Sequence, residues 1–151
     1  MFFKPVHSGT GDYNALIVDG SEFRDVRGSP PYYIDIPDQK RIVFATGTWG
    51  PSNPGVIHVF DFRNNRYWQF KTTWGQGSSF GEGVNEKTKG ERNSVEKSTD
   101  DEMVLIDESL SLGTLRKIVL DLESKRIKHV EWFLYDDKGK LTNSYIKRGN
   151  P

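Results

Sequence analysis

The sequence contains no cysteine, carries no net charge and has no long apolar run, and each absence excludes a class of protein. Without cysteine there are no disulfides and no thiolate chemistry. The 21 basic and 21 acidic residues cancel, which argues against non-specific binding to nucleic acid or to an anionic membrane. No stretch approaches the roughly 20 apolar residues of a membrane-spanning helix. We therefore expect neither a nucleic acid nor a membrane as a partner.

The first residues, MFFKPV at positions 1–6, have an apolar pair but no apolar run of signal-peptide length. We therefore expect a cytoplasmic protein, or a secreted one if the chain is a processed form. A length of 151 residues is typical of one domain with its own core, so we expect a single β domain over 1–151. Plentiful aromatic residues and scarce alanine favour strands over helices.

The strongest strand signals lie between residues 41 and 74. The run VIHVFDF, residues 56–62, is dense in β-branched and aromatic residues, which fit a pleated, half-buried surface. Alternation along a strand places His58 and Phe60 on one face and the intervening Val59 on the other. The turn RNNR, residues 63–66, supplies two asparagines, which tolerate left-handed backbone angles, and a second strand follows at 67–73. This pattern predicts a β-hairpin.

Further strand signals occupy most of the chain and are joined mainly by short turns. After an irregular lead-in at 1–12, we expect strands near 13–18, 22–26, 32–36, 41–46, 56–62, 67–73, 103–106, 114–122, 126–135 and 140–146. Because sequential strands usually pair, the sequence predicts an all-β antiparallel meander of about 8–10 strands. Two closures are open to such a meander, a calycin-like up-and-down barrel and a two-sheet sandwich.

Residues 75–102 differ in kind from the rest. They are almost all small, polar or charged, and their apolar residues are Phe80, Val84 and Val95. This apolar surface is too small to offset the entropy lost on ordering. A structureless connection of this length is uncommon inside a compact domain and is often functional. We therefore expect one long mobile loop within the domain.

One motif recurs along the chain. VFDFRNNRY at 59–67 and VLDLESKRI at 119–127 share the pattern apolar, apolar, Asp, apolar, three polar residues, Arg, apolar, and YIDIPDQKRI at 33–42 has one more turn residue. An aspartate near a strand end can accept hydrogen bonds from turn amides. The pattern resembles the hairpins of β-propeller blades. A propeller needs at least four blades, and this chain has strands for two or three, so we interpret the motif as hairpin chemistry.

Two histidines are candidates for chemistry. His129 and Glu131 share a strand face, the spacing of a His-x-Glu metal pair, but a stable site needs further ligands that the sequence does not place there. We therefore expect no metal and no cofactor. His58 shares a face with Phe60 and is interpreted as a hydrogen-bonded core or pocket-lining residue. The alternative is a small barrel enzyme, a hydrolase or isomerase that uses one of these histidines with carboxylates in an apolar cavity.

Aromatic residues in loops are the most suggestive functional feature. Trp49 and Trp74 lie in or beside glycine-rich loops that flank the same hairpin, and Phe80 follows in the second loop. Loop aromatics stack on sugars and anchor protein interfaces, although a tryptophan can also fold back over the end of a core. Since no catalytic motif is assembled, we expect a non-catalytic binding module for a protein or small-molecule partner. The candidate binding residues are Trp49, Trp74, Phe80 and His58.

Overall fold

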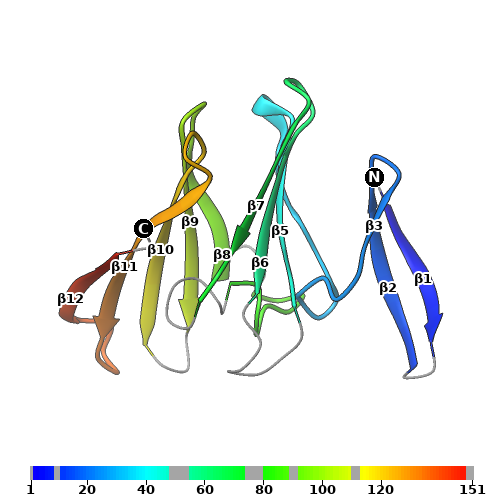
Figure 1. Cartoon of the computed structure of the whole chain (residues 1–151). Helices are drawn as coiled ribbons and strands as arrows, with labels where there is room; N and C mark the ends of the chain where they lie inside the picture. Colours follow the sequence, from blue (N-terminus) through cyan, green and yellow to red (C-terminus); the bar gives the residue numbers. More distant parts are fainter. Residues whose placement is uncertain are drawn as a thin grey trace.

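The computed structural model describes residues 2–8, 11–47, 55–73, 80–88, 92–109 and 113–148; within the first two strands it describes the side chains of 3–4 and 15–18. The chain is all-β and forms three antiparallel sheets, as Figure 1 shows. The predicted all-β antiparallel fold is confirmed. In the described residues, no helix is long and apolar enough to cross a membrane.

Each sheet is a meander in which neighbouring strands are also neighbours in sequence. The N-terminal sheet contains β1 (Phe2–Ser8), β2 (Gly11–Val18) and β3 (Ser21–Phe23). The middle sheet contains β4 (Ile34–Ile36), the 3-10 turn η1 (Pro37–Gln39), β5 (Arg41–Thr46), β6 (Val56–Asp61) and β7 (Arg66–Lys71). The C-terminal sheet contains β8 (Asn93–Ser98), β9 (Glu102–Ser109), β10 (Thr114–Asp121), β11 (Arg126–Tyr135) and β12 (Leu141–Arg148).

Two closures were predicted, a barrel and a sandwich, and the structure has layered sheets as in a sandwich. The middle sheet lies between the other two (Figure 1), and no sheet of the described residues closes into a barrel. One buried cluster joins the middle and C-terminal sheets, and a second joins the middle and N-terminal sheets. The central strand β6 is apolar on both faces for this reason: Ile57 and Val59 enter the first cluster, while Phe60 packs against the second. The predicted alternation along this strand is confirmed.

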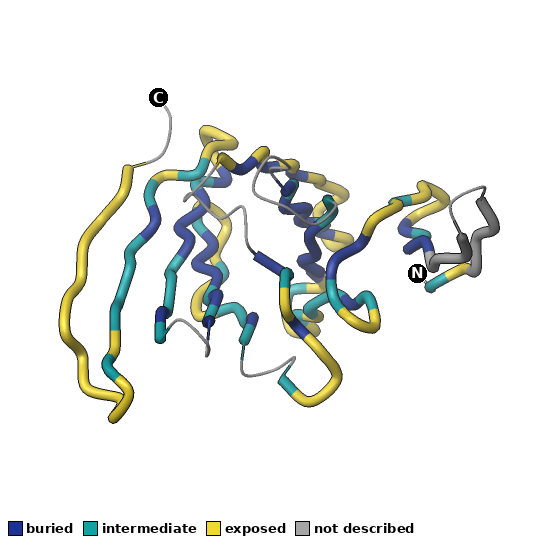
Figure 2. Tube along the Cα trace, turned by 90° about the horizontal axis from the view of Figure 1, so that it is seen from below, coloured by how far each residue is buried: buried dark blue, intermediate teal, exposed yellow. Residues whose placement is uncertain are grey.

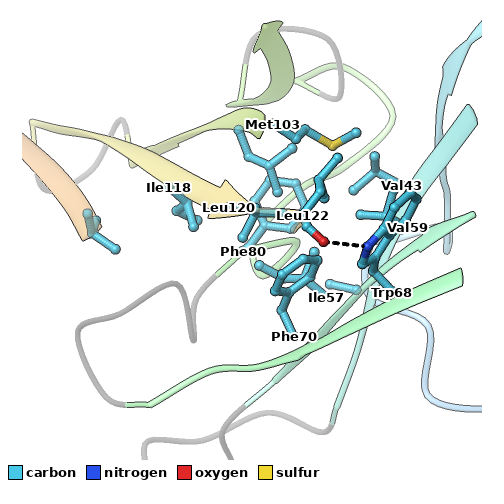
Figure 3. Packing of buried hydrophobic residues seen from close by; sticks show 13 residues of the cluster. Val43, Ile57, Val59, Trp68, Phe70, Phe80, Met103, Ile118, Leu120 and Leu122 are labelled. Carbon is cyan, nitrogen blue, oxygen red and sulfur yellow. Dashed lines mark hydrogen bonds between the residues drawn. The ribbon is translucent and has the colours of Figure 1, made fainter. Parts of the chain in front are cut away.

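The larger core lies between the middle and C-terminal sheets (Figure 3). A hydrogen bond of 2.9 Å from Trp68 Nε1 to the Leu122 carbonyl oxygen ties the two sheets together inside it. This bond satisfies the one polar atom that a buried tryptophan brings into a core. The cluster contains Val43, Ala45, Ile57, Val59, Trp68, Phe70, Phe80, Met103, Leu105, Ile118, Leu120, Leu122 and Val130. Burying large side chains of this kind contributes about 1.5–3 kcal/mol each, so this core is the main source of stability.

The recurrent Asp–Arg motif forms the turns that the sequence predicts. Asp61 Oδ1 accepts the Asn64 amide at 2.9 Å, and Asp121 Oδ1 accepts the amide of Ser124 at 3.2 Å. In both hairpins the residue directly before the arginine has a positive φ, 51° at Asn65 and 60° at Lys125. A left-handed residue reverses the chain in a tight turn, which lets the arginine begin the returning strand.

Two parts of the chain differ from the sequence prediction. Residues 1–12 were expected to be irregular, but β1 pairs with β2 over its whole length. Pro5 lies in β1, an edge strand of its sheet, which is where proline is found within sheets. Residues 75–102 were expected to be one loop, but β8 lies within this range and pairs with β9. The mobility of the connection stays a prediction.

The C-terminal edge of the fold, at β12, is open to solvent. All eight residues of β12 are exposed, and Figure 2 shows this strand as a yellow stretch of the tube that leads to the C-terminus. Its partner β11 is only partly buried beyond Val130. Trp132 of β11 and Tyr145 of β12 stack with ring centroids 5.7 Å apart, so the hairpin is held by its own side chains. The packed layers therefore end at β10 and β11.

Candidate functional site

Two of the four predicted binding residues, Trp49 and Trp74, lie outside the described residues. The prediction that their loops form a working surface therefore stays a prediction. Changing both tryptophans to alanine tests it: unchanged melting temperature with lost binding supports a surface role, and a collapsed melting temperature means a structural one.

Phe80 has a different place from the one expected. Its ring is 1% exposed and belongs to the larger core between the middle and C-terminal sheets. Its main-chain oxygen accepts a 3.1 Å hydrogen bond from Arg27 Nη1, which fixes the connection before β8 against the middle sheet. A ring enclosed on all sides offers no contact to a ligand, so Phe80 anchors this connection and supplies no binding surface.

His58 is buried between aromatic rings and holds no charge at neutral pH. Its Nε2 lies 2.8 Å from Thr46 Oγ1 and its Nδ1 lies 2.7 Å from Tyr67 Oη, so each ring nitrogen already has a hydroxyl partner. The imidazole stacks on Phe44 at 4.8 Å. Burial lowers the pKa of His58 from 6.5 to about 4. A neutral histidine bonded to two hydroxyls organises a core, and neither partner is a carboxylate that could form a catalytic pair with it.

His129 and Glu131 lie together on the outward face of the C-terminal sheet. Nε2 of His129 is 3.2 Å from Oε1 of Glu131, so the predicted pair does form. Within the described part of the chain, no group of three or more histidine, aspartate or glutamate side chains is placed to hold a metal ion. The pair is therefore a surface interaction between neighbours on one strand.

A groove lies between β4 and β8, which sequence reasoning did not predict. These strands are edge strands of two different sheets, β4 of the middle sheet and β8 of the C-terminal sheet. The groove has a volume of about 600 Å³ and is lined by Tyr33, Ile34, Asp35, Ile36, Pro37, Asp38, Gln39, Asn93, Ser94, Val95, Glu96, Lys97 and Ser98. A volume of this size is typical of ligand sites.

Hydrogen bonds across the groove fix its two ends and its width. At one end Tyr32 Oη donates to Asn93 Oδ1 at 2.9 Å, and at the other Gln39 Nε2 donates to the Ser98 carbonyl oxygen at 2.6 Å. Since Tyr32 precedes β4 and Gln39 follows it, β4 and β8 run in the same direction. Between the two ends, β8 spans six residues, or roughly 20 Å of extended chain.

The end near Gln39 is held by a buried ion pair. Arg41 Nε donates to Asp61 Oδ2 at 3.0 Å, and both side chains are almost fully buried. Burial alone would raise the pKa of Asp61, but hydrogen bonds from Asn64 and Arg41 outweigh it and lower that pKa. Arg41 Nη1 then reaches across to the Thr99 carbonyl oxygen at 2.7 Å. The charged pair thereby fixes the end of β8 against β5, which makes this wall of the groove rigid.

The groove combines an apolar floor with a polar lining that includes two exposed aspartates. Ile34, Ile36 and Val95 are half-buried and pack against the larger core, so their outer surfaces form the floor. Asp35 and Asp38 are exposed. No ion pair to either carboxylate occurs among the described residues, and Arg63 donates to the main-chain oxygen of Asp38 and not to its carboxylate.

The remaining charges in the lining are already partnered. Glu96 Oε1 receives Lys117 Nζ at 2.9 Å, and Lys97 Nζ lies 3.3 Å from Glu102 Oε1. The uncompensated charge of the groove is therefore negative and resides on Asp35 and Asp38.

The sequence carried only a weak signal for this site. The Ile–Asp–Ile alternation of β4 predicts a strand, but the run NSVEKS of β8 has one apolar residue and resembles a loop. A groove between two sheets depends on which edges meet, and no local pattern encodes that. No protein-family model, no curated protein and no solved structure matches this chain, so the function has to be inferred from the groove and its own residues.

Proposed function

We propose that this protein is a non-catalytic binding module that takes an extended segment of a protein partner into the groove between β4 and β8. The observation that carries the proposal is the meeting of two strand edges over one apolar floor. In the described part of the chain, no strand pairs with the outer edge of β4 or of β8. Main-chain groups on such edges bind extended peptides in many recognition domains.

The shape and rigidity of the groove support the same function. A groove of roughly 20 Å fits several residues of extended chain and is long for a compact small molecule. Both of its ends are fixed by hydrogen bonds within the protein, so little ordering of the protein is required on binding. A preorganised site loses less entropy when a flexible segment binds, which raises affinity for a given contact area.

The geometry around the histidines favours binding over catalysis. The alternative enzyme would need a histidine and a carboxylate within hydrogen-bond reach inside an apolar cavity. His58 bonds to Thr46 and Tyr67, and neither of these side chains is a carboxylate. The side chains that line the groove include carboxylates and no histidine.

The experiment is a selection of peptides on the full chain, followed by affinity measurement. A phage library of random dodecapeptides is panned on the immobilised protein, and enriched peptides are synthesised and titrated by calorimetry. Two variants place a charge at half-buried isoleucines of the same core: Ile36→Asp in the groove floor, and Ile127→Asp as the matched control in β11.

The expected result is that Ile36→Asp lowers the affinity for the enriched peptides by about tenfold or more, as for a central interface residue. Ile127→Asp should leave the affinity unchanged, which separates a local effect from general loss of stability. If no peptide is enriched, or if the enriched peptides bind Ile36→Asp as tightly as the parent protein, the groove is not a peptide site and the proposal is overturned.

A further inference from the structure

We infer that the segment bound in this groove is basic, and that it joins β4 as an additional strand with alternating basic and apolar residues. This inference rests on the proposed function and adds the chemistry of the partner. Three observations carry it: the direction of the main-chain groups of β4, the alternation of its side chains, and the uncompensated carboxylates of the groove.

The main-chain groups of Asp35 point into the groove. The Phe62 amide donates to the Lys40 carbonyl oxygen at 2.9 Å, so this carbonyl points toward β6, while the Lys40 amide donates to the Pro37 carbonyl oxygen. A carbonyl and the N–H that follows it point in opposite directions from one planar trans peptide, so the Arg41 N–H points toward β4, where the partner of Arg41 is Ile36. Asp35, one residue before Ile36, therefore turns its N–H and C=O to the outer edge of the middle sheet.

A second contact on the same strand agrees with this alternation. The Arg27 amide donates to the Ala45 carbonyl oxygen at 2.9 Å. Ala45 lies four residues after Arg41, so both direct their main-chain groups to the β4 side of β5. The donor and the acceptor of Asp35 are thus available to a strand laid along the groove.

The opposite wall also turns main-chain groups toward the groove. Gln39 Nε2 reaches the Ser98 carbonyl oxygen, so this part of β8 directs its outer edge at β4. Strand β8 carries an irregularity between Val95 and Lys97, where Glu96 has no partner in β9. Bulges interrupt a regular ladder, which makes β8 the poorer template and leaves β4 as the edge that an incoming strand joins.

The side chains of β4 set the residue pattern of the added strand. Ile34 and Ile36 face the larger core, and Asp35 lies between them on the opposite face. Residues of an added strand that stand beside the isoleucines contact the apolar floor, and the residues between them stand beside Asp35. Opposite charges directly across two strands attract, so lysine or arginine fits the position beside Asp35.

The uncompensated negative charge of the groove also favours a basic partner. Asp35 and Asp38 are exposed carboxylates, while Glu96 and Lys97 of the facing wall are each neutralised by a partner. A basic segment would compensate both aspartates, whereas an acidic one would meet like charges in the groove. Electrostatic complementarity of this kind selects partners and speeds encounter.

The strand β12 is another open edge that could attract a peptide, and its chemistry differs. Its eight exposed residues, LTNSYIKR, include Lys147 and Arg148 and no acidic residue. A basic segment would find no carboxylate on β12 with which to pair. The same peptide therefore distinguishes the two edges, because its sign of charge fits only the groove.

The probes are three capped peptides that differ only in charge: Ser-Lys-Val-Lys-Val-Lys-Ser, its twin with glutamate for lysine, and its twin with threonine for lysine. Each is titrated into the full chain and followed by calorimetry and by amide NMR, at roughly 20 mM and roughly 200 mM sodium chloride. A fourth peptide carries the lysine sequence with N-methyl groups on alternate amides, which blocks strand pairing and keeps the charge.

The lysine peptide should bind about threefold to tenfold tighter than the threonine peptide, the gain expected of two exposed ion pairs. The glutamate peptide should bind more weakly than both, and salt should reduce the differences. NMR shifts should centre on Asp35 and β8, and N-methylation should abolish binding. In the double variant Asp35→Asn with Asp38→Asn, the affinity for the lysine peptide should fall to that for the threonine peptide. In the matched double variant Glu123→Gln with Asp137→Asn, the affinity for the lysine peptide should stay unchanged.

The failures of the two proposals can be told apart. Equal affinity of the lysine and threonine peptides at the groove overturns the basic specificity and leaves the peptide-binding function standing. An unchanged affinity of the N-methylated peptide overturns strand addition in the same way. Peptide shifts that centre on β12 overturn both, since the groove is then not the binding surface.

Discussion

Lowering the pH from about 7 to about 4 should destabilise this protein by a contribution that comes from His58. The side chain is 3% exposed and stacks against aromatic rings, and its two hydrogen-bond partners are neutral hydroxyls. No carboxylate is among these partners to compensate a positive charge on the ring. Burial therefore lowers the pKa of His58 from 6.5 to about 4 in the folded protein.

The sign and size of the effect follow from this difference in pKa. Below the unfolded-state pKa the unfolded chain takes up a proton that the folded protein refuses, so the free energy of unfolding falls as the pH falls. The loss begins near pH 6.5 and is complete near pH 4, where the folded protein also accepts the proton. At ~1.4 kcal/mol per pH unit the loss reaches about 3 kcal/mol, a large share of the ~5–15 kcal/mol of a typical domain.

The assay is urea unfolding at a series of pH values for the parent protein and for His58→Gln. Glutamine stays neutral at every pH and can still bond to Thr46 and Tyr67, while the carboxylates titrate alike in both proteins. The difference between the two curves should change by about 3 kcal/mol between pH 7 and pH 4. Parallel curves over this range would refute the reasoning, and so would an imidazolium signal of folded His58 by NMR near pH 6.

Three further predictions concern stability and order. Asp61→Ala should cost about 3–5 kcal/mol, because it leaves the Arg41 charge buried without its partner, and Arg41→Met with Asp61→Leu should restore much of that loss in urea unfolding. Phe70→Ala should cost about 3–5 kcal/mol by the same measurement, because its ring is buried in the larger core. Native trypsin digestion should cleave after Lys87 before Lys97, because Lys87 lies in an exposed turn while Lys97 is paired in β8.

Each of these predictions has an outcome that contradicts it. A double variant no more stable than Asp61→Ala would mean that the polar network around Thr99 needs the arginine itself. A Phe70→Ala protein that unfolds within about 1 kcal/mol of the parent would place the core elsewhere. First cleavage after Lys97, identified by mass spectrometry, would mean that β8 opens more readily than the turn before it.

Local sequence determined the strands with strong periodic patterns. The hairpin of β6 and β7 and the hairpin of β10 and β11 were predicted near their observed bounds, because β-branched and aromatic residues alternate there around polar turns. The faces of His58 and Phe60 also followed from a period of two. The meander order followed because neighbouring strands joined by short turns pair with each other.

Tertiary structure decided the rest, because the deciding contacts join residues far apart in the chain. Strand β8 has a single apolar residue, Val95, and becomes a strand because β9 supplies its hydrogen-bond partners. Phe80 enters the core since sheets from both halves of the chain close around it. The pKa of His58 depends on burial between two sheets, and the groove exists only where β4 and β8 are brought side by side by Tyr32 and Gln39. Such pairings depend on loop closure and layer packing, which leave no periodic signal in the residues themselves.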